Sequence, residues 1–375
     1  MGSTFTGLSG KTKEDFGHGD AQFITYMNVF SNPVANLEMT EAVEIDAKQN
    51  RVKKGDVFFT TSSETPEEVG MSCVMPENKD NIYLNSFCFG YRPTEKFDLD
   101  YLAYVLRADS FRKEMKFLAQ GISRYNISKN KVMEVSIPIP NLEEQTMVGR
   151  YFSTLDHLIT LHQRKCEQTK KLKKYMLQKM FPQNGAKVPE IRFDGFTYDW
   201  EQRKLSELLE KYEDPVETPH DGYERVGIRS HAKGTFHSFV EPGKELDTAK
   251  MYRVAADKFI LNITFAWEHA VAITDNNDAG KLVSHRFPQF SFNPKLKPHF
   301  FKYLMLDKKF REHLELSSPG GAGRNRVLKI SDMLKYEIKL PSIEEQIKIG
   351  EYFDSLDHLI TLHQRQHKLH LNMLL

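Results

Sequence analysis

Apolar side chains recur at alternating spacings of four and three residues in two stretches of the chain, one starting at Val148 and one at Ile349. This spacing predicts an α-helix whose narrow apolar seam packs against a partner helix. Both seams end in polar side chains, chiefly histidine. The seam positions are Val148, Phe152, Leu155, Ile159, His162, Cys166 and Thr169 in the first stretch, and Ile349, Phe353, Leu356, Ile360, His363, His367 and His370 in the second.

Each predicted helix has its own start signal. Asn141 and Ser342 are suited to cap the first turn, and Glu144 and Glu345 complete a capping box three residues later. The first helix is expected to stop before Pro182, which cannot continue it. Two seams in one chain can close on each other only when the helices run antiparallel. We therefore expect two long antiparallel connector helices.

The two stretches are copies of each other. The decapeptide LDHLITLHQR occurs at 155–164 and again at 356–365, and the likeness extends back to 139 and 340 without a gap. Solenoid repeats recur every 20 to 50 residues or so, and a period near 200 therefore indicates a whole domain plus a connector in each copy. The predicted division is a first domain at 1–140, a first connector at 141–185, a second domain at 186–340 and a second connector at 341–375.

The two predicted domains share little identity but the same order of signals. Each has an apolar strand ending in hydroxylic or amide side chains, further strands broken by proline, a helical segment and a loop rich in Gly, Arg and Asn. Each is interpreted as a strand-rich α+β domain with one longer helix, tied by its last strand to the connector. The paired segments are 54–62 and 256–264, 83–93 and 283–294, 100–118 and 299–316, and 119–128 and 317–331.

Composition sets limits on this picture. The chain has 375 residues, of which 40% are apolar, enough for more than one core. Lys and Arg number 16 against 19 Asp and Glu in 1–140, and 25 against 23 in 186–340, so charge alone does not indicate a nucleic-acid binder. The exception is 164–179, where seven basic residues accompany one acid, Glu167. A solvated helix face and a phosphate-tracking stripe both fit that stretch.

Cysteines, hydropathy and histidines exclude some classes of protein. Three widely spaced cysteines without a C-x-x-C pair favour a reducing, cytoplasmic compartment over a disulfide framework or structural zinc site. No apolar run approaches the roughly 18 residues of a membrane helix, and the first residues are too polar for a signal peptide. His363, His367 and His370 share a helix face, but no carboxylate joins them at seam spacing, so a polar seam is favoured over a metal site.

The Gly/Arg/Asn loops carry the most informative chemistry. Glycine allows close backbone approach, while Arg and Asn suit bidentate contacts with base edges or phosphate. An ordinary exposed turn explains one such loop equally well, but the same chemistry at the same place in both domains favours binding. Polar strand ends are weaker candidates. The candidate contacts are Ser123, Arg124, Asn126, Thr25, Tyr26, Asn28, Thr60, Thr61 and Ser62 in the first domain, and Arg324, Asn325, Arg326, Arg229, Ser230, His231, Asn262, Thr264 and Trp267 in the second.

The connector phrases PNLEEQ (140–145), LDHLITLHQRKCEQTKKLKKYMLQKMFP (155–182) and LPSIEEQ (340–346), together with VPEIRFDGFTYDWEQRKLSELL (188–209), resemble the specificity subunit of type I restriction-modification systems. The resemblance covers essentially the whole chain. It implies two target recognition domains, each reading one half of a split, asymmetric DNA sequence in the major groove, joined by antiparallel helices. It further implies that these helices dock two methyltransferase subunits and, through them, restriction subunits. We expect Leu158, Leu161, Leu359 and Leu362 to face the methyltransferases.

No catalysis by the chain itself is expected. The sequence has neither an N/D-P-P-F/Y methyltransferase motif nor a G-x-x-x-x-G-K-S/T phosphate loop. The resemblance places S-adenosylmethionine in the partner methyltransferase, and ATP and magnesium in the partner restriction subunit, with no cofactor in this chain. A competing interpretation is a bivalent protein-binding scaffold with two heads on a helical rod, which the near-neutral charge favours.

The sequence departs from the family pattern at both ends. Family members usually open with a leader like 188–209, which has no counterpart before Met1, and the second connector stops at Leu375, short of a counterpart to MLQKMFP. These departures indicate a truncated or rearranged form, and they leave the packing of the first domain and the completeness of the second docking surface as open questions.

Overall fold

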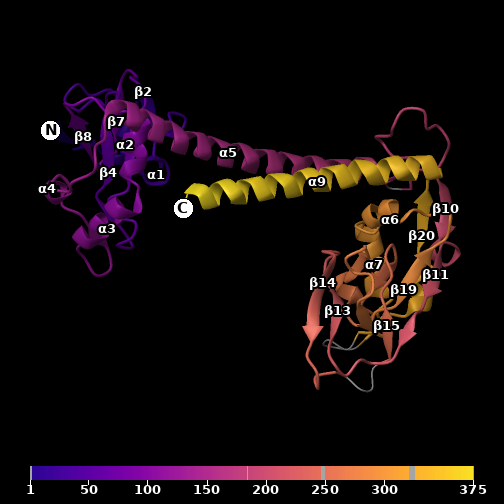
Figure 1. The fold of residues 1–375 in the computed structure, drawn as a ribbon. Coiled ribbons are helices and arrows are strands. Elements are labelled where there is room, and N and C mark those ends of the chain that lie inside the picture. Colours follow the sequence, from indigo (N-terminus) through magenta and orange to yellow (C-terminus); the bar gives the residue numbers. More distant parts are fainter. Residues whose placement is uncertain (1, 184, 246–249, 321–325, 375) are drawn as a thin grey trace. The chain divides into compact units, whose positions relative to one another are not determined.

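The computed structural model of the chain describes residues 2–183, 185–245, 250–320 and 326–374 (Figure 1). The chain forms two compact units, one of 1–161 with 366–375 and one of 162–365. The division falls inside both long helices, so the predicted boundaries near 140, 185 and 340 stay predictions. The long helices are α5 (Leu142–Lys179) and α9 (Ile343–Leu374).

The domain of the first unit is built around a four-stranded antiparallel sheet, β1-β8-β4-β6. Its strand β4 is buried along its whole length, as an apolar central strand should be. A second sheet, β3-β2-β7, contains a parallel β2–β7 pair, and β5 pairs with β9. The elements are β1 (Gly2–Thr6), β2 (Phe16–Ile24), α1 (Tyr26–Ser31), β3 (Thr40–Val43), β4 (Val57–Thr60), β5 (Ser62–Ser63), β6 (Ser72–Val74), β7 (Ile82–Leu84), β8 (Cys88–Pro93), α2 (Leu99–Val105), α3 (Asp109–Leu118), β9 (Tyr125–Asn126) and α4 (Lys129–Val132).

The domain of the second unit repeats this plan. Its four-stranded sheet β11-β19-β16-β17 has the same order, and β13 pairs in parallel with β18 and antiparallel with β14, as β2 does with β7 and β3. Strands β15 and β12 extend that second sheet, and β10 pairs with β20. The elements are β10 (Glu201–Lys204), β11 (Leu209–Tyr212), β12 (Pro215–Val216), β13 (Tyr223–Ile228), β14 (Thr235–Val240), β15 (Met251–Arg253), β16 (Phe259–Leu261), β17 (Val271–Ile273), β18 (Leu282–Ser284), β19 (Gln289–Phe292), α6 (Pro298–Leu304), α7 (Lys308–Leu316), α8 (Ile330–Met333) and β20 (Glu337–Leu340).

Two details of the predicted domain plan are wrong. The single longer helix of each domain is two helices, α2 and α3 or α6 and α7. In the first domain the break lets Arg107 turn inward and donate to the backbone carbonyls of Ser72 and Asn32, and in the second Asp307 caps α7. The predicted last strand forms only in the second domain, as β20. In the first domain 135–140 is not a strand, and no described residue pairs with it as β10 does with β20.

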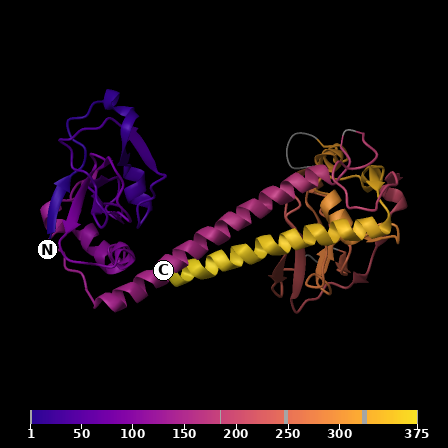
Figure 2. The same cartoon turned by 90° about the horizontal axis from the view of Figure 1, so that it is seen from above.

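The connector helices pair antiparallel within the second unit, as predicted (Figure 1, Figure 2). Nδ1 of His162 lies 3.1 Å from Nδ1 of His363, and Lys173 forms an ion pair with Asp357 at 2.5 Å, so later residues of α5 meet earlier residues of α9. Three cations of the basic stretch form ion pairs, and a phosphate-tracking role for that stretch stays a prediction. These pairs are Lys170 with Glu167, Lys173 with Asp357, and Lys179 with Glu190. Among the described helices, none combines the length and apolarity needed to cross a membrane.

Each connector helix is fixed to its own domain by a repeated set of contacts, which we call the joint. A joint combines a glutamine, a glycine, a phenylalanine and an aspartate of the connector with the helix that follows the four-stranded sheet. The first joint is Gln145, Gly149, Phe152 and Asp156 of α5 against Asp98, Tyr101 and Tyr104, and the second is Gln346, Gly350, Phe353 and Asp357 of α9 against Lys297, His299 and Tyr303.

The glutamine of each joint is buried and makes the same two bonds in both copies. It accepts from the backbone N–H of the N-cap residue of α2 or α6 and donates to the carbonyl of the proline before the connector. The bonds are Gln145 Oε1 with Asp98 N at 3.1 Å, Gln145 Nε2 with Pro140 O at 2.8 Å, Gln346 Oε1 with Lys297 N at 2.9 Å and Gln346 Nε2 with Pro341 O at 3.1 Å.

The glycine of each joint allows the two helices to approach closely. A Cβ on Gly149 would lie 2.5 Å from the backbone nitrogen of Tyr101, and one on Gly350 would lie 3.0 Å from Cβ of His299. Because backbone cannot move aside as a flexible side chain can, the first joint has no room for a larger residue.

The aromatic pair completes the joint. Tyr104 packs on Phe152 with ring centroids 5.5 Å apart and donates to Asp156 at 2.7 Å. Tyr303 packs on Phe353 at 5.0 Å and is hydrogen-bonded to Asp357 at 2.8 Å. Burial, and then the bond to aspartate, raises the pKa of both tyrosines, so both stay protonated donors. Phe152 packs on its own domain, which corrects its predicted role as chiefly a seam residue, whereas Phe353 packs both on Tyr303 and on Phe181 at the end of the first connector, with centroids 6.0 Å apart.

Gln346→Ala is expected to destabilise the second unit by about 1 to 3 kcal/mol, because it removes the amide that bonds the half-buried Lys297 N–H and the buried Pro341 carbonyl. Both tryptophans of the chain, Trp200 and Trp267, lie in this unit, so urea denaturation followed by tryptophan fluorescence reports on it. Gln364→Ala, at an exposed position of the same helix, is the matched control. Equal midpoints for the two variants would contradict the role of the buried amide.

Candidate nucleic-acid interface

In each domain the Gly/Arg/Asn loop returns to the end of the buried central strand. The Ile127 N–H donates to the Thr61 carbonyl at 3.0 Å, and the Leu328 N–H donates to the Ile263 carbonyl at 2.9 Å. These bonds occupy equivalent places in the two copies. The loop and the strand end, which were predicted separately from the sequence, therefore form one surface in each domain.

A turn that the sequence interpretation missed borders the same surface. The Thr61 N–H donates to the Phe87 carbonyl and the Ile263 N–H to the Arg286 carbonyl, both at 3.0 Å. Phe87 is 58% exposed, and Arg286 is also exposed. The available signal was positional, because both residues precede the strand that starts with Cys88 or Gln289 in the paired segments 83–93 and 283–294.

The first contact surface centres on Ser62. The Arg124 guanidinium donates to Ser62 Oγ at 3.2 Å, and the Tyr26 hydroxyl donates to the Ser62 carbonyl at 2.8 Å. Ser62 also pairs with Asn126 in the β5–β9 ribbon. The ribbon thus holds the exposed loop beside the start of α1 and the end of the central strand. The first contact surface comprises Tyr26, Thr61, Ser62, Phe87, Ser123, Arg124 and Asn126.

The second contact surface centres on Trp267. The Arg326 guanidinium lies over the indole at 5.4 Å, and the indole N–H donates to the Thr264 carbonyl at 3.1 Å. Glu268 then links the next loop, accepting from the Ser230 hydroxyl at 2.6 Å. The second contact surface comprises Arg229, Ser230, His231, Thr264, Trp267, Arg286 and Arg326.

Two candidates are fully buried, and two others act as local caps. Asn28 and Thr60 have no exposed surface, because Asn28 bonds the carbonyls of Asn36 and Met39 and Thr60 accepts the Met71 N–H. Both are withdrawn as direct contacts. The other two act as local caps. Thr25 accepts the Asn28 N–H, and Asn262 accepts the Thr264 N–H and hydroxyl. Arg324 and Asn325 lie outside the described residues.

The surfaces offer donors and aromatic faces but no reaction centre that the described residues reveal. Arg229 stacks over Phe236 at 5.3 Å and donates to the Thr235 carbonyl, which leaves part of its guanidinium open to solvent. Exposed guanidinium groups beside aromatic rings can bond base edges and phosphates. In the described part of the chain, no group of three or more His, Cys, Asp or Glu is arranged to hold a metal ion.

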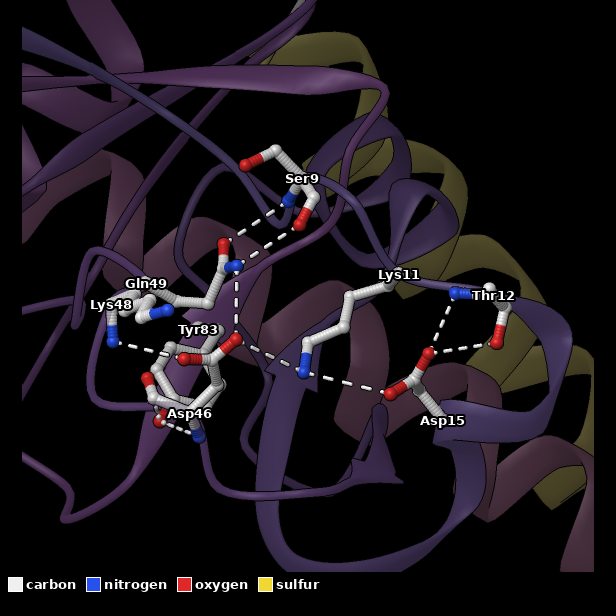
Figure 3. Close-up of polar contacts among 8 residues, drawn as sticks. All are labelled: Ser9, Lys11, Thr12, Asp15, Asp46, Lys48, Gln49 and Tyr83. Carbon is white, nitrogen blue, oxygen red and sulfur yellow. Dashed lines mark hydrogen bonds and ion pairs between the residues drawn. The ribbon is translucent and has the colours of Figure 1, made fainter.

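A polar cluster of the first domain, which we call the clamp, ties 9–12 to 46–49 (Figure 3). The first part of the clamp, 9–15, precedes β2, the strand that leads to Tyr26 of the first contact surface. Its hydrogen bonds from Lys48, Gln49 and Lys11 lower the pKa of Asp46. The bonds are Gln49 with both backbone groups of Ser9 at 3.1 and 3.0 Å, Lys11 with Asp46 at 3.2 Å and Asp15 at 3.7 Å, Thr12 N with Asp15 at 2.6 Å, and the Tyr83 hydroxyl with both backbone groups of Asp46 at 3.1 and 3.0 Å.

A family model described as the type I restriction modification DNA specificity domain matches 5–171 and again 198–372. The chain belongs to this specificity family. The two matches fall on the two copies of the internal repeat, as expected for two target recognition domains.

Curated relatives and a solved structure agree with this assignment. A putative type I restriction enzyme specificity subunit of Methanocaldococcus jannaschii, MjaX, is 26% identical over 92% of this chain and 82% of its own length. The MjaVIII specificity subunit of the same organism is 25% identical over 71% of this chain and 65% of its own length. The type I S subunit from M. genitalium has the same fold, with a TM-score of 0.55 at 14% identity over 100% of this chain and 91% of that chain.

Family membership decides between the two functions that the sequence left open. The chain is a DNA specificity subunit of a type I restriction-modification system, and the protein-binding scaffold is set aside. The α+β fold with two repeated domains and long antiparallel connector helices, expected from the sequence, is likewise confirmed. Neither conclusion depends on net charge. The near-neutral charge favoured the protein-binding scaffold, but DNA binding needs only local hydrogen-bond donors.

The clamp is expected to open in acid. The pKa of Asp15 and Asp46 is lowered in the folded chain, by bonds from Thr12 and from Lys48 respectively, so their contribution is complete above the ordinary aspartate value of about 3.9 and is lost as the pH falls through the lower folded values. Lys11→Met should raise the pKa of Asp46 towards its ordinary value without reaching it, because the other bonds remain. Carboxyl NMR titration measures this, and Lys13→Met is the exposed control. A matching shift in the control would show that Asp46 senses general charge.

Proposed function

We propose that the first and second contact surfaces each bind one half of a split DNA target. The observation that supports this most strongly is their repetition: the same loop-to-strand bond in both domains presents an arginine at the same edge, the exposed Arg124 in one copy and the half-buried Arg326 in the other. A structural turn needs no such repetition of charge. Different neighbours, Ser62 against Trp267, would give the two domains different base preferences.

The two arginines are suited to direct readout for different reasons. Arg326 is held by stacking on Trp267 and by an ion pair of one terminal nitrogen with Glu315 at 3.5 Å, which together orient its planar fork without using all its donors, so further contacts to guanine remain open. Arg124 is oriented by Ser62. Beside it, Ile122 is 96% exposed and can contact a thymine methyl group. Phe87 and Arg286 are proposed as additional contacts on the bordering turns.

The connector helices are proposed to dock two methyltransferase subunits. The same helix face is open in both copies: a groove in the first unit includes Thr146, Arg150, Thr154 and Leu158, and one in the second includes the equivalent Ile347, Glu351, Ser355 and Leu359. Leu359 and Leu362 are exposed, whereas Leu158 and Leu161 are half-buried. A repeated docking surface explains why the decapeptide is identical in the two copies.

The chemistry of the complex is proposed to reside in its partners. S-adenosylmethionine would bind the methyltransferases, and ATP and magnesium the restriction subunits, with no cofactor and no catalysis in this chain. The assembled complex would act in the cytoplasm, where it would meet double-stranded DNA. What supports a non-catalytic role is the family of the chain and the chemistry of its contact surfaces, which consist of donors and rings.

Replacing both leading arginines tests the DNA contacts. Each of Arg124→Ala and Arg326→Ala should weaken binding of the cognate duplex by the methyltransferase complex about 5- to 150-fold, the equivalent of roughly 1 to 3 kcal/mol for a bidentate contact. Fluorescence anisotropy at fixed salt measures the affinity, and Arg311→Ala, an exposed arginine outside the second contact surface, is the control. Unchanged specific affinity in the double variant would rule out these loops as readers.

Introducing a negative charge on the open face of a connector helix tests the proposed docking of methyltransferase subunits. Leu359→Glu should abolish co-purification of one methyltransferase subunit, because a carboxylate would be desolvated at the interface. At 41% exposure Leu359 is not needed for the core, so circular dichroism and tryptophan fluorescence of the isolated chain should not change. Thr361→Glu, an exposed neighbour, is the control. Full retention of two methyltransferases by a Leu158→Glu, Leu359→Glu double variant would place the dock elsewhere.

A further inference from the structure

Next to the repeated contacts of the joints, the two copies differ in charge. Where the domain helix meets the connector glycine, the first domain has Asp100 and the second has His299. The two positions are equivalent in space: a Cβ on Gly149 would lie 3.0 Å from Cβ of Asp100, and one on Gly350 would lie 3.0 Å from Cβ of His299. An acid in one copy thus takes the place of a base in the other, within the same backbone geometry.

In the second joint an acid of the connector faces this base. The Asp354 carboxylate pairs with the His299 ring and, at 2.8 Å, with the Lys302 ammonium, and it accepts the Tyr303 hydroxyl at 2.6 Å. Burial raises the pKa of Asp354, but the bonds from Lys302, Tyr303 and His299 outweigh burial and hold that pKa below its ordinary value. The half-buried carboxylate is therefore ionised, and the domain that it faces compensates its charge.

In the first joint the equivalent connector residue is Ser153, which carries no charge. Its side chain is hydrogen-bonded to Asp100, and Ala103 stands at the position of Lys302. Burial raises the pKa of Asp100, and this effect exceeds the lowering by the bond from Ser153. A second carboxylate at position 153 would therefore meet Asp100 without the lysine that balances Asp354 in the other copy.

Most of the joint fits either domain. Its glutamine, glycine, phenylalanine and aspartate are identical in the two connectors, and each domain presents a tyrosine to the shared aspartate. Both connectors belong to one chain, so each is available to either domain at a high effective concentration. Specificity is a difference between affinities, and a group that is unfavourable in the wrong pairing increases it. A carboxylate at the connector position 153 or 354 is such a group, because it is favourable with the second domain and unfavourable with the first.

We propose that Ser153 and Asp354, with the domain residues that face them, form a matching code that lets each domain dock on its own connector and rejects the other connector, in this chain or in a second copy. Docking of the first domain on α9 would place Asp100 against Asp354 in a half-buried site, which is unfavourable for two carboxylates. Docking of the second domain on α5 would leave His299 and Lys302 facing the neutral Ser153. The matching code does not rest on the proposed DNA contacts. Its consequence does, namely that each contact surface stays with its own half of the split target.

Exchanging the matching code inside the second unit tests it, by urea denaturation of the full chain followed by tryptophan fluorescence. His299→Asp with Lys302→Ala introduces the domain side of the first joint, and Asp354→Ser introduces its connector side. Asp354→Ser should lower the denaturation midpoint of the wild type by on the order of 0.3 to 1 M, but should raise that of the His299→Asp, Lys302→Ala variant by a similar amount. The matched control is Asp357→Ser, which removes the aspartate common to both joints and should lower the midpoint in both backgrounds.

A loss of equal size from Asp354→Ser in both backgrounds would show that position 354 does not sense the domain, and would overturn the proposal. If the His299→Asp, Lys302→Ala variant does not fold, the first joint supplies a second measurement. There Ser153→Asp should speed amide hydrogen exchange of α2 about tenfold, and Asp100→His should restore slow exchange in that variant. Continued fast exchange would equally contradict the matching code. These variants lie outside both contact surfaces, so failure of the proposal would leave the DNA-specificity function intact.

Discussion

The joint between each domain and its connector is the constraint on which the rest of the fold depends. Gly149 and Gly350 bring two helices into near contact, and the buried amides of Gln145 and Gln346 bond partly buried backbone groups of their own domains. Rotation of a domain about its connector would break these bonds and create a clash. Each domain and the connector helix of its joint are consequently one rigid body. The loops at the far ends of its strands therefore keep a fixed orientation relative to that helix.

This constraint explains which parts of the two copies are alike. The connector residues of the two joints are identical, because a joint has a single geometry to preserve: Gln145 and Gln346, Gly149 and Gly350, Phe152 and Phe353, and Asp156 and Asp357. The contact surfaces have no such requirement. They share a backbone bond that places the loop, while the side chains on it differ, with Ser62 supporting one arginine and Trp267 the other. A common scaffold can thus present different chemistry at the same place.

The sequence alone was sufficient to predict features that depend on residues close together in the chain. Helix starts at Asn141 and Ser342 follow from side chains that cap nearby N–H groups, and each accepts the predicted bond. The predictions were wrong where contacts between residues distant in the sequence determine the local structure. Nothing in the periodicity of 100–118 shows that the helix breaks and that Arg107 turns inward. Asn28 and Thr60 are polar residues of the kind found at exposed strand ends, but both are buried and bonded to backbone groups. Phe87 and Arg286 lack any motif and are identified only by position.

Glu144 and Glu345 show most directly what a repeated motif does not specify. Both were predicted to complete a capping box, but the Glu345 carboxylate instead gives both oxygens to Arg192. A buried carboxylate without a partner is strongly unfavourable, so the segment around Arg192 that covers Glu345 must bring its own cation. The exposed Glu144 needs none, since water solvates it. The same residue is therefore compatible with a bare helix and with a covered one, but any segment that covers the first copy must supply a positive charge at that point. Whether the glutamate is buried depends on the covering segment. The residue beneath that segment indicates the charge that the segment must carry.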